Sequence, residues 1–348
     1  MRIEKKVVSE FMGIGYVRKK NYFRYFSFVT LIIFCFQLTN DGFSQQVSQE
    51  VQTFPLEILA TRSIVLYDFS ISAKEAGQAQ KTFAKIGIDA EAYFRYDVVF
   101  SGYDPKVAFE KYFNSRQISY LVLFQKQAEV YKIGFCVFDS KIGIRDNPTE
   151  IYKIENRDLS DLLQTLSKDS WNSGQKKNFL INETPETDIF VNPINGKRQD
   201  YYPLDLKVDK LAVPKFGISE MDTLLVRFFK DNYPMKYEFV DSLTSDEKLR
   251  GQSFAYVLCY IHTQAIDIKK LLGYDLLKEE KGMYSSVTYP KGQLQVKTLP
   301  EETSVYKFYA RHTNNGNIFV GPKWDADINW LDALENYILG FEVTANIR

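Results

Sequence analysis

A short apolar stretch occurs twice in this chain of 348 residues. IVLYDFSIS spans residues 64–72 and LAVPKFGIS spans residues 211–219. Each is followed by a segment whose apolar residues recur every three or four positions, the spacing of one helix face. An internal repeat constrains the architecture more than any single motif does. We therefore expect LAVPKFGIS to open a second copy of a domain, rather than to add a strand to the first sheet.

The same order of elements follows both stretches. After the first helix comes a strand, at residues 90–94 in one half and 236–240 in the other. After a second helix come the apolar runs ISYLVLF (118–124) and FAYVLCY (254–260), which suggest strands covered on both faces or central in a sheet. Each half closes with a strand and a helix. The sequence predicts an α/β (α+β) fold of two related β-α-β-α-β-β-α modules in tandem, each a mixed sheet with packed helices.

Polar residues mark the expected helix starts. Asp104 is predicted to cap a helix that has Pro105 at its first position, where the missing N–H costs nothing. Thr244 and Glu247 form a candidate capping box in the second half. Asp158 and Asp327 are the expected caps of the two closing helices.

The boundaries follow from these elements. Residues 55–181 are expected to form the first module and residues 207–348 the second. Residues 182–206 are polar and contain prolines, so they are the expected linker, although they could extend an edge strand. The second module carries an insertion at 283–299, predicted as a hairpin that turns near Pro290–Gly292.

The N-terminal segment 1–44 has the parts of a secretory signal peptide. A basic stretch precedes the apolar run 26–38, and small residues precede a cut before Gln45. The run is too short for a membrane-spanning helix, so no stable transmembrane segment is expected after cleavage. Met12 is an alternative start, because the residues before it are superfluous for export. The ending GFSQ resembles signal peptides common in Bacteroidetes.

Charge and cysteine content narrow the function classes. The 44 basic and 44 acidic side chains give zero net charge, which argues against a dedicated nucleic-acid binder. The mature chain keeps Cys136 and Cys259, which fall in different modules and are expected to be separate buried thiols. No motif for a phosphate, dinucleotide or catalytic metal is present, so no cofactor is expected.

The most site-like segment is NNGNIFVGPKWDAD, residues 314–327. Trp324, Asp325 and Asp327 lie in this loop, and His262 and His312 end two predicted strands. These five residues are the candidate binding surface. If the two strand ends were neighbours, the histidines and an aspartate could hold zinc. The simpler interpretation is a tight turn with Trp324 folded onto the last helix and solvent-facing histidines.

The motifs IVLYDF (64–69) with ISYLVLF, and LAVPKF (211–216) with FAYVLCY, resemble the N-terminal domain of TolB and the related domains of CsgG and of lipoprotein activators of penicillin-binding proteins. The chain departs from TolB by having no six-bladed repeat after the domain, and from CsgG by having no lipobox and no membrane hairpins. The resemblance implies an envelope protein that docks partners, in the periplasm or at the outer membrane.

Three functions are therefore considered for this chain. The first is a non-enzymatic scaffold that binds an envelope protein through its paired modules. The second is a glycan- or peptidoglycan-binding module that uses Trp324 and exposed tyrosines. The third is a hydrolase with a site around His262 and His312.

Overall fold

The computed structural model describes residues 53–145, 148–173, 176–187, 189–242, 244–277 and 282–347. Residues 52–348 form one compact unit. The expected signal peptide lies outside the described residues.

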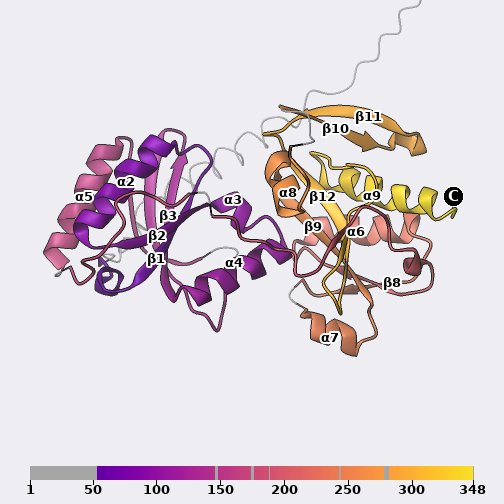
Figure 1. The fold of residues 1–348 in the computed structure, drawn as a ribbon, viewed down its shortest axis with the longest axis horizontal. Helices are drawn as coiled ribbons and strands as arrows, with labels where there is room; N and C mark the ends of the chain where they lie inside the picture. The colour runs from indigo at the N-terminus through magenta and orange to yellow at the C-terminus, as the bar shows by residue number, and fades with distance from the viewer. Residues whose placement is uncertain are drawn as a thin grey trace, which may run out of the picture. The chain divides into compact units, whose positions relative to one another are not determined.

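The first half is a mixed five-stranded sheet in the order β2-β1-β3-β4-β5 (Figure 1). β1 pairs in parallel with β2 and β3, whereas β4 pairs antiparallel with both β3 and β5. Its elements are η1 (Leu56–Leu59), β1 (Arg62–Tyr67), α2 (Ala73–Ile86), β2 (Asp89–Arg95), α3 (Tyr96–Val99), α4 (Tyr103–Ser115), β3 (Ile118–Gln127), β4 (Val130–Val137), β5 (Glu150–Asn156) and α5 (Leu159–Ser173).

The second half has a six-stranded sheet in the order β6-β13-β12-β9-β7-β8, and a separate hairpin of β10 and β11. Its elements are β6 (Arg198–Gln199), η2 (Leu204–Lys207), β7 (Leu211–Pro214), α6 (Ser219–Asn232), β8 (Tyr237–Val240), α7 (Asp246–Gly251), β9 (Tyr256–Gln264), α8 (Ala265–Leu271), β10 (Met283–Thr288), η3 (Pro290–Gly292), β11 (Gln295–Pro300), β12 (Ser304–His312), β13 (Ile318–Phe319) and α9 (Trp330–Thr344).

The α/β fold class is confirmed, and the two sheets begin alike. β8-β7-β9-β12 repeats the order and directions of β2-β1-β3-β4, with parallel pairs first and an antiparallel pair next. α8 and the β10–β11 hairpin are the additions of the second half. Origin by duplication stays a prediction, which this shared order supports.

Each sheet has an apolar layer on both faces. In the first half, α2 and α5 cover one face, where Phe83 and Leu166 are fully buried. α4 covers the other face with Phe109 and Phe113. In the second half, α6 and α9 lie on one face, and α7 and α8 lie on the other. Burying each such large side chain stabilises the fold by about 1.5–3 kcal/mol.

The expected linker 182–206 is divided between the two halves. The main-chain N–H of Tyr93 in β2 donates to Glu186 O, so this segment covers the open side of β2. Further on, β6 pairs with β13, and Tyr202 is buried in the second core. The segment therefore extends an edge strand, which was the alternative to a free linker.

One of the four expected helix caps is confirmed and three are corrected. Asp158 accepts from Asp161 N at the start of α5, as predicted. The capping residue of α7 is Ser245 and not Thr244, and that of α9 is Asn329 and not Asp327. Asp104 lies inside the first turn of α4, after Gly102. α2 has a capping box of Ser72 and Glu75, which matches the predicted helix there.

The start of α4 connects the two halves. Asp104 accepts from Tyr309 Oη at 2.6 Å and lies 3.0 Å from Arg311 Nε, and both partners belong to β12. β7 pairs with β9 at only two positions, and further along β9 the N–H of His262 donates to Ser101 O at 2.7 Å. The turn before α4 thus takes the place of a neighbouring strand beside β9.

Candidate functional site

Trp324 is buried rather than displayed on the surface. Its side chain is 8% exposed, with the Lys269 ammonium 4.9 Å from the ring and Tyr274 edge-on at 5.5 Å. Its carbonyl accepts from Val287 N in the hairpin. The ring therefore belongs to the core cluster that holds α8 and the hairpin residues Tyr284 and Leu299, whereas the core residues of α9 belong to another cluster. A buried ring has no face to offer to a sugar, which removes the sequence-based reason for a glycan site at this loop.

Asp325 and Asp327 are also buried, each beside a lysine. Asp325 Oδ1 lies 2.7 Å from Lys307 Nζ, and the Lys307 side chain is fully buried. Asp327 forms an ion pair with Lys297 of β11, and its main chain forms a bridge with Tyr306. The candidate surface at this loop is thus corrected: Trp324, Asp325 and Asp327 fix the loop in place.

His262 and His312 lie at opposite ends of a strand pair. β9 and β12 are antiparallel, so His262 pairs with Tyr306 and His312 pairs with Tyr256. Six residues of strand separate the two sites, about 20 Å at 3.4 Å per residue. The two histidines are therefore not neighbours, and the alternative of a metal site that joins them is excluded. No group of metal-ligating side chains occurs among the described residues.

Each histidine has an aromatic neighbour. The His262 ring stacks on Tyr306 at 3.8 Å, and its Nε2 lies 3.2 Å from Ser304 Oγ. Burial lowers the pKa of His262, against a smaller effect of Asp97. The His312 ring meets Tyr256 edge-on at 5.1 Å. These contacts account for both histidines as side chains that pack on neighbouring residues of the sheet.

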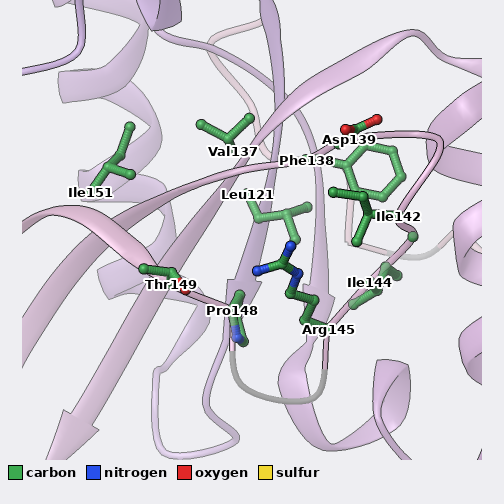
Figure 2. A pocket seen from close by; sticks show the side chains of 11 residues that line it. Leu121, Val137, Phe138, Asp139, Ile142, Ile144, Arg145, Pro148, Thr149 and Ile151 are labelled. Carbon is green, nitrogen blue, oxygen red and sulfur yellow. The ribbon is translucent and has the colours of Figure 1, made fainter.

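A cavity of about 250 Å³ lies in the first half, where β4 ends and β5 begins (Figure 2). We call it the β4–β5 groove. β3 contributes Leu121 to it, and β4 contributes Val137. The remaining lining residues come from the β4–β5 connection and the start of β5: Phe138, Asp139, Ile142, Gly143, Ile144, Arg145, Pro148, Thr149 and Ile151.

The groove exists because the two faces of the first sheet are covered unequally. α2 and α5 both pack on one face, whereas α4 packs on the other over β1, β2 and β3. Near β4 and β5 the chain itself fills part of this face with Phe138 and Ile144, which are buried. A hydrogen bond from Ile144 N to Glu110 of α4 holds that connection in place. The space left over is the groove.

The rim of the groove is apolar and accessible. The exposed fractions are 57% for Val137, 56% for Ile142 and 39% for Ile151. Arg145 lies among these side chains in Figure 2 and is exposed, so it adds a positive charge. Beside the groove, β5 pairs with β4 on one side only, as far as the described residues go.

Sequence reasoning missed this groove. Its one local signal was the pair Ile142 and Ile144 in an otherwise polar connection. The other lining residues become neighbours only when β3, β4 and β5 pair.

Comparisons with protein-family models, curated proteins and solved structures found no match to this chain. In the described part of the chain, no helix is long and apolar enough to cross a membrane.

Proposed function

We propose that this chain is an exported, non-enzymatic envelope protein that binds another protein through the β4–β5 groove. The observation that supports it best is that exposed apolar side chains lie next to β5, an edge strand of the first sheet. Single exposed apolar residues are ordinary on a protein surface. Val137, Ile142 and Ile151 instead surround one cavity, which gives their surface a shape that a partner can match.

The size of the groove favours a protein partner over a small molecule. Small-molecule sites enclose roughly 300–1,000 Å³. The groove offers about 250 Å³, enough for one or two apolar side chains. Arg145 at its wall favours a carboxylate next to those side chains, because an Arg guanidinium binds carboxylates with two parallel hydrogen bonds. The partner is therefore a protein with an apolar side chain and an acidic residue close together.

The remaining parts of the proposal come from the sequence. The pattern of residues 1–44 supports export, and the resemblance to TolB and CsgG domains supports the envelope as the location. Zero net charge is consistent with a protein partner and gives no support to nucleic acid.

The test is affinity capture after crosslinking in intact cells, with the groove changed in matched variants. Val137→Glu and Ile142→Glu each place a charge at the apolar rim. Val296→Glu is the control, since Val296 is 61% exposed on β11 in the second half. We expect one stoichiometric envelope protein with the wild type and with Val296→Glu. Its recovery should fall about fivefold or more in the groove variants, as for a residue worth over 1 kcal/mol to binding.

Equal recovery of that partner by all variants would show that the groove is not the docking surface. Recovery of no envelope protein by the wild-type chain would contradict the proposed function itself.

A further inference from the structure

Lys307 and Asp325 form an ion pair inside the second half of the molecule, away from solvent. Lys307 lies in the middle of β12 with a side chain that is fully buried, and the Asp325 side chain is 3% exposed. The Nζ atom lies 2.7 Å from Asp325 Oδ1 and 5.0 Å from the ring centre of Tyr337 in α9. An isolated charge in such surroundings is costly, and pairing offsets only part of that cost.

The hydrogen bonds of the pair are unevenly distributed. Lys307 Nζ donates to two main-chain carbonyls, Phe308 O at 2.7 Å and Val320 O at 2.8 Å. Neither carboxylate oxygen of Asp325 has a contact with hydrogen-bond geometry among the described residues, although Oδ1 is close to Nζ. A buried carboxylate normally accepts several hydrogen bonds, whereas the charge of Asp325 is stabilised mainly by the single neighbouring ammonium of Lys307.

We propose that Lys307 and Asp325 become joined by an isopeptide bond between Nζ and Cγ. One proton passes from the Lys307 ammonium to the Asp325 carboxylate, which leaves a neutral amine and a neutral acid. The amine lone pair attacks Cγ, and the N–C bond forms. The acid hydroxyl then leaves with a second proton from Nζ, as one water molecule. No oxidant, cofactor or activated donor is needed.

The geometry prepares the neutral pair for this step. With two N–H groups held by Phe308 O and Val320 O, the lone pair of a neutral amine is free for Asp325. Burial lowers the pKa of Lys307, and burial raises the pKa of Asp325 to about 6 against the opposing effect of Lys307. Both pKa shifts lower the free energy needed to convert the charged pair into a neutral amine and a neutral acid. The short distance from Nζ to Oδ1 replaces a bimolecular encounter by a contact within one molecule. Intramolecular reactions reach effective molarities of roughly 10⁵–10⁸ M once the reacting groups are aligned.

The bond would also remove the buried charge and one of the two Asp325 oxygens that lack hydrogen-bond geometry. One oxygen of Asp325 departs as water, and the remaining one becomes an amide carbonyl. The link would tie β12 to the turn before α9. Cys136 and Cys259 are both free, so neither supplies a covalent link among the described residues.

The test is mass spectrometry of the purified, denatured wild-type protein. We expect an intact mass lower than the sequence mass of the processed chain by one water. Trypsin does not cleave after an acylated lysine. Digestion should therefore give a branched peptide in which residues 298–311 are joined to residues 324–348.

Cleavage after Lys307, with 298–307 and 324–348 recovered only as separate peptides, would overturn the proposal. Two variants locate the bond. Asp325→Ala should abolish the branched peptide, whereas Asp327→Asn, two residues away, should retain it. A branched peptide that persists in Asp325→Ala would also overturn the assignment. The wild-type digest decides the question even if Asp325→Ala fails to fold.

Discussion

At the scale of single residues, Gly102 shows how closely the turn before α4 approaches β9. A Cβ atom added at Gly102 would lie 2.2 Å from Tyr260 O, closer than any side-chain carbon can approach a main-chain oxygen. The neighbouring atom belongs to a strand, so it cannot move without disturbing the sheet. Residue 102 must therefore be glycine, because the main chains of the turn and of β9 lie too close together for a side chain.

Gly102→Ala is therefore expected to destabilise the protein by about 1–3 kcal/mol, the usual cost of overpacking. Chemical denaturation measures the change. Gly77→Ala is the matched control, because nothing lies within 4 Å of a Cβ at this position in α2. There alanine should stabilise the helix by about 0.5–1 kcal/mol. Equal effects of the two substitutions would contradict the assigned close approach.

A second residue-scale prediction concerns Glu75 and pH. Burial acts to raise its pKa, but hydrogen bonds from Ser72 and Tyr131 lower the pKa of Glu75 to about 2. Because the pKa of Glu75 is lower in the folded state, its ionised carboxylate stabilises the fold at pH values above the ordinary pKa of 4.5. This stabilisation is lost as the pH falls toward 2. Glu75→Gln keeps an acceptor at this position but removes its charge near the helix N-terminus, so it should cost about 0.3–1 kcal/mol at pH 7.

The difference between Glu75→Gln and the wild type should shrink as the pH is lowered from 5 to 3. Urea unfolding at each pH measures it. Glu129→Gln is the control, because the Glu129 side chain is 86% exposed. A deficit that stays constant with pH would argue against the ionised capping box.

At the scale of elements, the strands and helices were largely predictable and their ends were not. The apolar runs 118–124 and 254–260 predicted β3 and β9 because buried strands need continuous apolar sequence. The caps failed where several polar residues compete within two or three positions, as with Thr244 and Ser245. Asp104 failed for a different reason, since Arg311 binds it from another sheet.

The candidate site was less predictable than the elements. The polar neighbours of Trp324 left two interpretations, display on the surface or packing on the last helix, and the structure instead places Lys269 and Tyr274 of the α8 region beside the ring. The histidines ended predicted strands, but strand direction decides whether two ends meet, and no local pattern states it. The groove needed the pairing of three strands before its residues came together.

The ion pair between Asp104 of α4 and Arg311 of β12 gives a prediction at the scale of elements. Arg311 lies between Asp104 and Asp246, and its side chain is 7% exposed. Arg311→Met would leave the Asp104 carboxylate buried without its cation. Breaking a buried pair in this way costs about 3–5 kcal/mol. Denaturant unfolding at neutral pH measures the loss.

The loss in Arg311→Met should be smaller at acidic pH. Burial raises the pKa of Asp104 and Arg311 opposes that rise, so without Arg311 protonation removes the uncompensated charge. Arg227→Met is the control, because the Arg227 side chain is 80% exposed and pairs with Asp231 on the same helix. Its effect should stay within about 0.5 kcal/mol. Similar losses in both variants would refute the buried ion pair.

At the scale of the whole molecule, residues 52–348 form one compact unit although they contain two large sheets and a separate hairpin. Ion pairs and hydrogen bonds at the start of α4 and around Arg95 join the halves, including Arg95 to Asp267 at 2.6 Å. We expect the mature protein to unfold in a single calorimetric transition, with equal calorimetric and van 't Hoff enthalpies. Two separate transitions in the wild type would show that the halves are independent.

The open side of β5 has a consequence for the behaviour of the protein at high concentration. An unpaired edge next to apolar side chains is a template on which further copies can add, strand on strand, into fibrils. β5 carries Lys153 and Glu155, both substantially exposed and paired with each other at 2.9 Å. Charges on an edge strand oppose such growth. Replacing both with threonine should leave the fold intact but allow aggregation, which light scattering at increasing protein concentration would detect.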